Sequence, residues 1–323
     1  MAGSGNLESR HFKVEYLADG VYVAYAKEDG AAWANAGIVD LGDCTIVFDT
    51  FVTPQAANDL KAVAESVTGR GVELVVNSHW HLDHIVGNQV FEAETEIYAT
   101  PYTRAKLLKD GIADIQQSFA EAATEIQVLT GRQAYEPDEI ARADIQFSLA
   151  YLRGMTQAMP SLNIRVPNRT VEGKLTIHGS ERTAELIHFG ANHTGGDLAL
   201  YLPNEGIIFA GDILAVQHHP WLGEADGNLE HWRETLKTIA GMKPKMVVPG
   251  HGPVGKNYHL KDLHDYIQTL QEIVQELVEQ AAMPDEVATN PIPKPYKAWR
   301  FAINNYPDSL RALHERMSAE YDQ

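Results

Sequence analysis

The feature that most constrains this chain is a dense cluster of metal-ligand residue types. Four such side chains lie within the stretch Ser78-His-Trp-His-Leu-Asp-His84, namely His79, His81, Asp83 and His84. Imidazole and carboxylate groups together suit zinc, iron or manganese. The cluster directly follows an apolar run, Val72-Glu-Leu-Val-Val76, which is typical of a buried strand. The chain must therefore fold so that a strand leads straight into a metal pocket.

The spacing of the cluster divides its side chains between two sites. Alternate residues of an extended chain share a face, so His79 and His81 can reach one ion together. Asp83 and His84 follow a turn, near the start of a helical stretch, and can point to a second ion. Gly87 and Asn88 then relieve crowding where the backbone passes close to the site.

Three further candidates lie far downstream, each after a strand-like run and before a glycine-rich turn. His193 lies in Gly190-Ala-Asn-His-Thr-Gly-Gly-Asp197, Asp212 in Phe209-Ala-Gly-Asp-Ile213, and His251 in Pro249-Gly-His-Gly252. Loops at strand ends are where rigid scaffolds present functional groups. We therefore expect all seven side chains to form one two-metal site.

Hydrophobic patterns predict two sets of strands, each with helices. In the first half, strands are expected over 12–16, 21–25, 34–39, 45–48, 72–76 and 96–99, with a helix over 54–67. In the second half, strands are expected over 174–177, 184–188, 197–201, 206–210 and 246–249, with a helix over 229–239. Both halves follow the same plan, with ligand candidates at strand ends.

Two regions are expected to be mainly helical. Residues of about 103–160 form a helical insertion in which Gly131 and Pro137 are expected as breaks, and its pattern fits a lid over the pocket and a scaffold hairpin equally well. The tail has helical patterns over 257–282 and 309–320, separated by the proline-rich stretch 291–295. We expect a main domain over 1–265 and a C-terminal helical extension over 266–323 packed on it.

Charge and cysteine content narrow the classes of partner. The net charge of −18 argues against nucleic acid and anionic membranes as partners. Cys44 is the single cysteine, so no intrachain disulfide can form, which fits a reducing compartment. Residues 1–10 lack the apolar core of a leader, and no run is apolar enough to span a bilayer. We expect a cytoplasmic protein with a small-molecule substrate, and the tail helix leaves room for a homo-oligomer.

The His-x-His-x-Asp-His element and the downstream ligands make the chain resemble the metallo-β-lactamase-fold superfamily, over roughly residues 14–264. The resemblance implies an α/β (α+β) fold, an αββα four-layer sandwich in which two sheets pack face to face with helices outside. It also implies a ligand set: His79, His81 and His193 for the first metal, Asp83, His84 and His251 for the second, and Asp212 as the bridge. Asp49 matches the aspartate of the first family motif, which supports the ligands from behind.

Two positions separate the chain from specialised branches of that superfamily. Class B1 β-lactamases carry cysteine where this chain has Asp212, and flavo-diiron oxygen reductases carry glutamate where it has His81. The resemblance therefore favours a hydrolase with a bridging aspartate, although Leu222-Gly-Glu-Ala-Asp226 with Trp232 still resembles a β-lactamase segment.

These observations predict a binuclear zinc hydrolase, with iron or manganese as alternative metals. Two divalent ions roughly 3.5–4 Å apart can hold a bridging hydroxide that attacks a carbonyl carbon, so no serine or cysteine nucleophile is required. The expected substrate is a β-lactam, lactone, ester or thioester. Asp83 is expected to act in catalysis by orienting or moving a proton, and His218 and Trp221 are candidates for substrate contacts. The alternatives are a phosphodiesterase of the same fold, a mononuclear-iron sulfur dioxygenase and a metal-stabilised binding protein.

Overall fold

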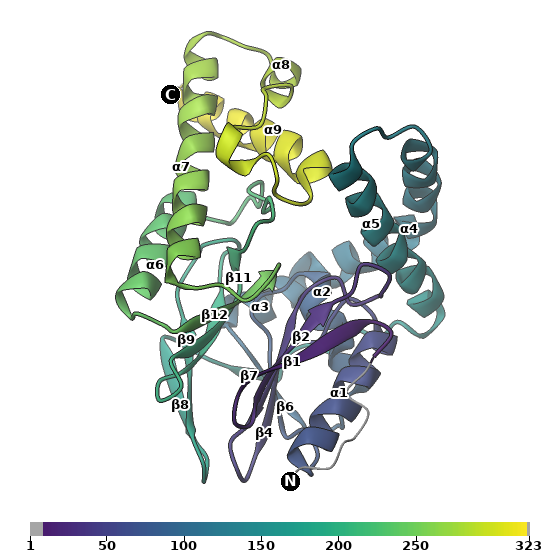
Figure 1. The fold of residues 1–323 in the computed structure, drawn as a ribbon, viewed down its shortest axis with the longest axis vertical. Helices are drawn as coiled ribbons and strands as arrows, with labels where there is room; N and C mark the ends of the chain where they lie inside the picture. The colour runs from purple at the N-terminus through teal and green to yellow at the C-terminus, as the bar shows by residue number, and fades with distance from the viewer. Residues whose placement is uncertain (1–8, 322–323) are drawn as a thin grey trace.

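Two β-sheets lie face to face at the centre of the protein, with helices on both outer sides (Figure 1). This computed structural model describes residues 9–321, so the expectation that residues 1–10 hold no leader falls mostly outside the described residues. The arrangement is the predicted αββα sandwich.

The first sheet has seven strands that pair in chain order. They are β1 (Phe12–Ala18), β2 (Val21–Ala26), β3 (Ala36–Asp40), β4 (Thr45–Phe48), β5 (Leu74–Val76), β6 (Glu96–Ala99) and β7 (Arg169–Thr170). Pairing is antiparallel from β1 to β4 and parallel from β4 to β7. Parallel neighbours need a crossover, which α1 (Pro54–Thr68) supplies between β4 and β5.

The second sheet has five strands in the order β12-β11-β10-β9-β8. They are β8 (Lys174–His178), β9 (Thr183–His188), β10 (Leu198–Leu202), β11 (Ile207–Ala215) and β12 (Met246–His251). Only β11 and β12 are parallel, and α6 (Leu229–Gly241) connects them. β11 is longer than the predicted strand over 206–210, because it continues to Ala215 through two shifts of register with β12.

The core lies mainly between the sheets, and side-chain alternation places it there. Ile46 and Phe48 of β4 pack toward the second sheet, whereas Val47 packs toward α1. In β10, Leu198 and Leu200 join the same central core. Strands buried on both faces are expected to be almost wholly apolar, which explains the continuous hydrophobic runs in the sequence.

α1 begins and ends at residues that the sequence marks clearly. The Thr53 side chain accepts a hydrogen bond from the Ala56 N–H, and Pro54 occupies the first helical turn. The helix ends at Gly69, whose φ of 71° is left-handed. The predicted helix over 54–67 is therefore confirmed, and its buried face covers the outside of the first sheet.

The inserted region consists of helices, as predicted, but one break was placed wrongly. Its elements are α3 (Pro101–Lys106), a π-helical turn η2 (Leu107–Gly111), α4 (Ile112–Gln133), α5 (Glu139–Ala158) and η3 (Met159–Ser161). Gly131 does not interrupt α4, because a single glycine costs a helix only about 1 kcal/mol. The break lies around Pro137, between α4 and α5.

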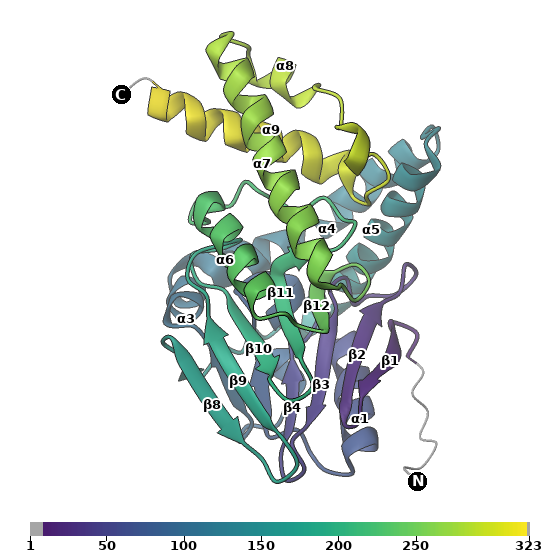
Figure 2. The ribbon, with the colours of Figure 1, turned by 60° about the vertical axis from the view of Figure 1, so that its left-hand side comes forward.

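The C-terminal helices cover the outside of the second sheet and rise above it (Figures 1 and 2). They are α7 (Asn257–Glu279), α8 (Pro284–Ala288), η4 (Lys294–Tyr296) and α9 (Ala302–Tyr321). α9 begins seven residues before the predicted start at Ser309 and contains Pro307. Burial of Tyr306 and Leu310 against α7 outweighs the backbone hydrogen bond that Pro307 removes. The boundary expected at 265/266 lies within α7, and the division into domain and extension stays a prediction.

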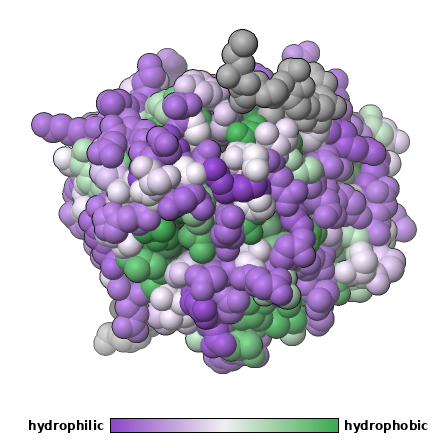
Figure 3. All heavy atoms as spheres, turned by 90° about the horizontal axis from the view of Figure 1, so that it is seen from below, coloured by the Kyte–Doolittle hydropathy of each residue, from purple (hydrophilic) through white to green (hydrophobic). Residues whose placement is uncertain are grey.

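The end of the molecule that lies opposite the C-terminal helices is seen from below in Figure 3. Its surface is mostly hydrophilic, with hydrophobic residues in separate patches. Among residues 9–321, no helix combines the length and the apolar character needed to cross a membrane.

Candidate metal centre

The seven expected ligands lie together where the two sheets meet the loops beneath the C-terminal helices. Four come from the segment after β5, in which α2 (Leu82–Ile85) and the 3₁₀ turn η1 (Val86–Val90) follow His81 directly. His193 precedes β10, and His251 is the last residue of β12. Asp212 lies inside β11, in its irregular part, and not beyond the strand end as predicted.

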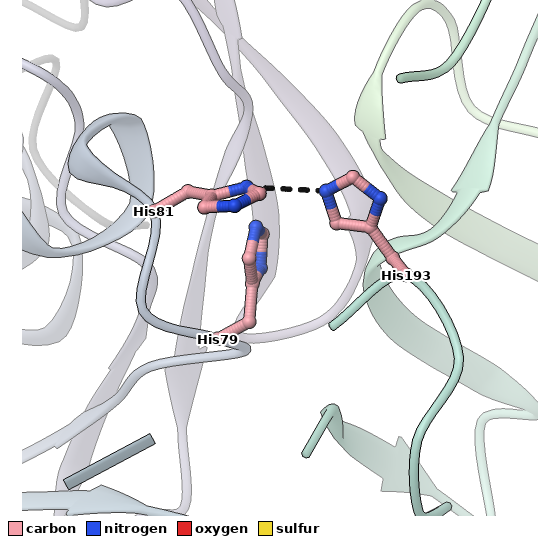
Figure 4. A group of neighbouring side chains, drawn as sticks. All are labelled: His79, His81 and His193. Atoms are coloured by element: carbon pink, nitrogen blue, oxygen red, sulfur yellow. Dashed lines mark hydrogen bonds between the residues drawn. The ribbon is translucent and has the colours of Figure 1, made fainter. Parts of the chain in front are cut away.

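The first group consists of His79, His81 and His193, whose ligand nitrogens all lie within 4.8 Å of one another. Figure 4 shows the three rings converging from two loops that are far apart in sequence. His193 Nε2 is 3.1 Å from His81 Nδ1, the contact drawn as a dashed line. Three imidazoles in this arrangement match a zinc-type site with room for a further ligand.

The second group consists of Asp83, His84 and His251. Asp83 Oδ2 is 3.2 Å from His251 Nε2 and 3.4 Å from His84 Nε2. Asp83 and His84 are buried, and His251 is partly exposed. The turn into α2 therefore separates the two halves of the histidine cluster as their spacing predicts.

Asp212 lies between the two groups and contacts both. Its Oδ2 atom is 3.5 Å from His193 Nε2 and 3.4 Å from His251 Nε2, while its Oδ1 atom is 3.3 Å from His84 Nε2. Gly250 makes this position available, because a Cβ atom at residue 250 would lie 1.8 Å from Asp212 Oδ1.

The chemistry of these atoms fits divalent ions. His79 Nε2, His84 Nε2 and Asp212 Oδ1 are buried and make no hydrogen bond of suitable geometry, although the last two atoms lie 3.3 Å apart. Leaving a buried polar atom unpaired costs roughly 1–3 kcal/mol, so a cluster of such atoms requires an explanation. Nitrogen and oxygen lone pairs that converge in this way are the donor set of zinc and related metals.

Burial and carboxylates shift the pKa values of the histidines in opposite directions. Burial lowers the pKa of His193 to about 4, which leaves its imidazole neutral and able to bind a metal. Burial also lowers the pKa of His251, but Asp212 and Asp83 outweigh it and raise the pKa to about 9. A metal must displace this proton, so metal affinity is expected to rise with pH.

Two carboxylates orient His84 and His81 by contacting the ring nitrogens that face away from the ligand cluster. Asp49 Oδ2 is 2.8 Å from His84 Nδ1, and the same side chain accepts hydrogen bonds from the N–H and hydroxyl of Ser78. Glu224 Oε2 is 3.0 Å from His81 Nε2, which leaves His81 Nδ1 to face the first group. Asp49 was expected in this position from the sequence. Glu224 was missed, although the segment that contains it had been noted.

A cavity of about 170 Å³ opens above the ligands. His218 and Trp221 line it, as do Trp33, Phe301 and Asn305, which sequence reasoning missed. Burial lowers the pKa of His218 to about 3, so its imidazole is uncharged at neutral pH. The contribution of His218 and Trp221 to substrate binding stays a prediction.

The αββα fold and the two adjoining ligand groups define a metallohydrolase-type architecture. Comparison with known proteins agrees, because the sequence profile of the metallo-beta-lactamase superfamily matches residues 34–251. The chain belongs to that superfamily, and membership supports a metal-dependent hydrolase.

Individual relatives are distant. A metallo-beta-lactamase type 2 from Pseudomonas aeruginosa is 23% identical over 252 residues, which cover 75% of this chain and 79% of that protein. A protein of the same description from Bacteroides fragilis is 25% identical over 122 residues, covering 37% of this chain and only 46% of that protein. A beta-lactamase-like protein 2 homolog from Drosophila melanogaster is 29% identical over 151 residues, covering 43% and 49%.

Solved structures show the same fold. A metallo-beta-lactamase from Pontibacter korlensis superposes with a TM-score of 0.57 at 17% identity, covering 80% of this chain and 99% of that one. A second, from Erythrobacter litoralis, gives a TM-score of 0.56 at 17% identity, covering 81% and 98%.

Proposed function

We propose that the protein is a binuclear zinc-dependent hydrolase that acts on a carbonyl substrate, namely a β-lactam, lactone, ester or thioester. The observation that carries this proposal is the position of Asp212, within 3.5 Å of ligand nitrogens in both groups. A carboxylate in that position can bridge two ions. His79, His81 and His193 would hold one ion, and Asp83, His84 and His251 would hold the other.

The chain supplies geometry and proton transfer. Bound divalent ions would supply a hydroxide nucleophile at neutral pH and would polarise the carbonyl oxygen. Burial tends to raise the pKa of Asp83, but His84 and His251 hold it well below the usual range. Asp83 is therefore an ionised carboxylate within the ligand cluster, and it could accept and return a proton during the reaction. Asp49 and Glu224 hold His84 and His81 in the tautomers that turn a lone pair toward the ions.

The two alternatives differ from this proposal in measurable ways. A phosphodiesterase would use the same ligands, because a carboxylate between two ions also suits phosphoryl chemistry. A mononuclear iron enzyme would need only the three histidines of the first group. The complete second group, with Asp83, His84 and His251 in contact, favours two metals.

A metal-reconstitution experiment tests the proposal. The purified protein is stripped with a chelator, assayed on ester, lactone, thioester, β-lactam and bis-p-nitrophenyl phosphate probes, and assayed again after zinc is restored. We expect about two zinc ions per chain and zinc-dependent turnover of a carbonyl probe. The Asp212→Ala variant should lose the full zinc content and the zinc-dependent turnover. The His178→Ala variant, changed on the exposed side of β8, should retain the zinc content and the turnover. Faster turnover of the phosphodiester, or one iron per chain, would replace the proposal by the matching alternative.

A further inference from the structure

The cavity above the candidate metal centre has an aromatic wall assembled from three separate parts of the chain. Trp33 comes from the loop between β2 and β3, Trp221 from the segment after β11, and Phe301 from the residue before α9. All three line the same cavity as the candidate ligands Asp83 and Asp212. A substrate bound at those ligands would therefore share its cavity with these three rings, which we call the aromatic wall below.

Neighbouring rings hold two members of the aromatic wall in place. The centroid of the Trp33 ring lies 4.8 Å from that of Phe301 and 5.8 Å from that of His251. His218 stacks on the other side of Phe301 at 5.2 Å. Tyr151 of α5 packs behind Trp33 at 4.1 Å. Contacts of this kind fix ring orientation before a ligand arrives.

The backbone near the aromatic wall is strained. Trp33, Gln217 and Phe301 have φ values of 70°, 55° and 61°, in the left-handed region that bulky residues avoid. Strained residues persist only where surrounding contacts enforce them, and they cluster at ligand-binding sites. The left-handed conformation of Phe301 is held by its backbone N–H, which donates a hydrogen bond of 2.6 Å to the buried carboxylate of Asp144. Arg300 pairs with the same carboxylate, so α5 and the start of α9 are locked together above the site.

Charge and size restrict what the cavity can admit. Among the described residues that line it, none is a lysine or an arginine. An anionic group between Trp221 and Phe301 would therefore lose its hydration without gaining a cationic partner. Lys13, Lys27 and Arg300 line a neighbouring cavity, which shares Trp33 but does not reach Trp221 or Phe301. The cavity volume of about 170 Å³ is also below the roughly 300–1,000 Å³ of sites for drug-sized ligands.

We propose that Trp33, Trp221 and Phe301 form an apolar subsite that selects substrates with a small, uncharged aryl or alkyl group next to the reacting carbonyl. This inference rests on the proposed carbonyl-hydrolase function and narrows its substrate class. Trp33 and Phe301 both lie outside residues 34–251, the part that matches the superfamily, whereas Trp221 lies within it.

Two esters with the same leaving group test the selectivity. We expect kcat/KM for 4-nitrophenyl phenylacetate to exceed that for its 4-carboxyphenylacetate analogue by at least roughly tenfold, the size of effect that one apolar contact in a pocket can produce. Phe301→Ala should lower kcat/KM for the neutral ester by roughly tenfold, mainly through KM, and should lower that for 4-nitrophenyl acetate by less. Phe301→Leu should retain most of the preference. Tyr258→Ala, an exposed change on α7, is the matched control.

A binding measurement separates failure of the subsite from failure of the hydrolase. Saturation-transfer NMR on the metal-free protein should detect phenylacetamide, with a weaker signal for Phe301→Ala and a nearly normal one for Phe301→Leu. Binding of the amide without turnover of any ester, lactone, thioester or β-lactam probe would retain the subsite and overturn the hydrolase. Equal turnover of the charged and neutral esters would overturn the subsite. An amide signal of equal strength in the wild type and Phe301→Ala would also overturn the subsite. Neither result would contradict the proposed hydrolase.

Discussion

At the scale of single residues, Asp49 and Glu224 perform the same task on different histidines. Each carboxylate contacts the ring nitrogen that faces away from the cluster, at 2.8 Å from His84 Nδ1 and 3.0 Å from His81 Nε2. The contact fixes the tautomer, so the opposite nitrogen keeps its lone pair for a metal. Asp49 and Glu224 are 175 positions apart, and the histidines they serve belong to different groups of ligands.

Replacing Glu224 by glutamine should weaken metal binding without removing a ligand. Glutamine is nearly isosteric but uncharged, so it supports the His81 ring less strongly. We expect zinc affinity to fall by roughly 10–100-fold, measured by competition with a chromophoric chelator. Glu94→Gln, at an exposed position, serves as the control. Equal zinc affinity in the wild type and Glu224→Gln would show that the Glu224–His81 contact does not orient the ligand.

Cys44 is expected to be unreactive in the folded protein. Burial raises the pKa of its thiol from the ordinary value to about 12, with Glu73 and Asp43 adding to the effect. A rise of about three units lowers the thiolate fraction at pH 8 by roughly a thousandfold, and the thiolate is the reactive form. Alkylation by iodoacetamide, followed by mass spectrometry, should therefore be far slower in the native than in the denatured protein. Similar rates would show that the thiolate is accessible in the fold.

At the scale of secondary-structure elements, a glycine decides whether the strands β11 and β12 can lie close together beside the candidate ligand Asp212. Gly250 of β12 lies beside Asp212 of β11, and any side chain at position 250 would meet the carboxylate. Gly131 is different, because a Cβ at that position in α4 would meet nothing within 4 Å. The two glycines therefore provide a matched pair of alanine substitutions with opposite expected effects.

Gly250→Ala should displace Asp212 and reduce the bound metal from about two ions toward one or none, as measured by elemental analysis. Gly131→Ala should leave the metal content unchanged and raise the free energy of unfolding by roughly 0.5–1 kcal/mol, because alanine favours a helix interior. Chemical denaturation measures the second effect. A full metal complement in Gly250→Ala would contradict a bridging position for Asp212.

Element boundaries were predictable where a local signal sets them and not where packing does. The ends of α1 follow from Thr53, Pro54 and Gly69, all of which act within a few residues. The start of α9 at Ala302 depends on Tyr306 and Leu310, which are buried against α7. That contact is invisible in a local pattern, and so the helix was predicted to begin too late.

At the scale of the whole molecule, one buried histidine connects the C-terminal helices to the sandwich. His219 Nδ1 accepts a hydrogen bond from the Tyr266 hydroxyl of α7 at 2.8 Å, and Nε2–H donates to the Tyr296 carbonyl at 3.2 Å. Its backbone N–H donates to the Arg300 carbonyl, and its carbonyl accepts from the Asn305 side chain. The segment that follows β11 is thereby joined to the region that carries Phe301.

His219 should make folding stability sensitive to acid. Burial lowers its pKa to about 4 in the folded protein, below the ordinary value of 6.5, so the unfolded chain binds the proton more readily. The neutral His219 ring therefore contributes up to about 3 kcal/mol to the free energy of unfolding. This contribution is fully present above about pH 6.5 and is lost as the pH falls toward 4. Urea unfolding of the metal-free protein at pH 7 and pH 5 should show a smaller loss of stability in His219→Gln than in the wild type. His178→Gln, at an exposed position, should behave like the wild type. Identical losses in all three proteins would contradict the prediction.

The sequence by itself determined the seven side chains that the structure brings together, and its resemblance to the superfamily implied the αββα class and the bridging position of Asp212. The choice of the seven side chains depends on local patterns: apolar strand-like runs, glycine-rich turns and the spacing of His79, His81, Asp83 and His84. Only the tertiary structure decided that Glu224 contacts His81 and that Trp33 and Phe301 share a cavity. The physical reason is range: each of these contacts joins residues more than a hundred positions apart, whose approach is set by how the two sheets and the C-terminal helices pack, not by any signal near either residue.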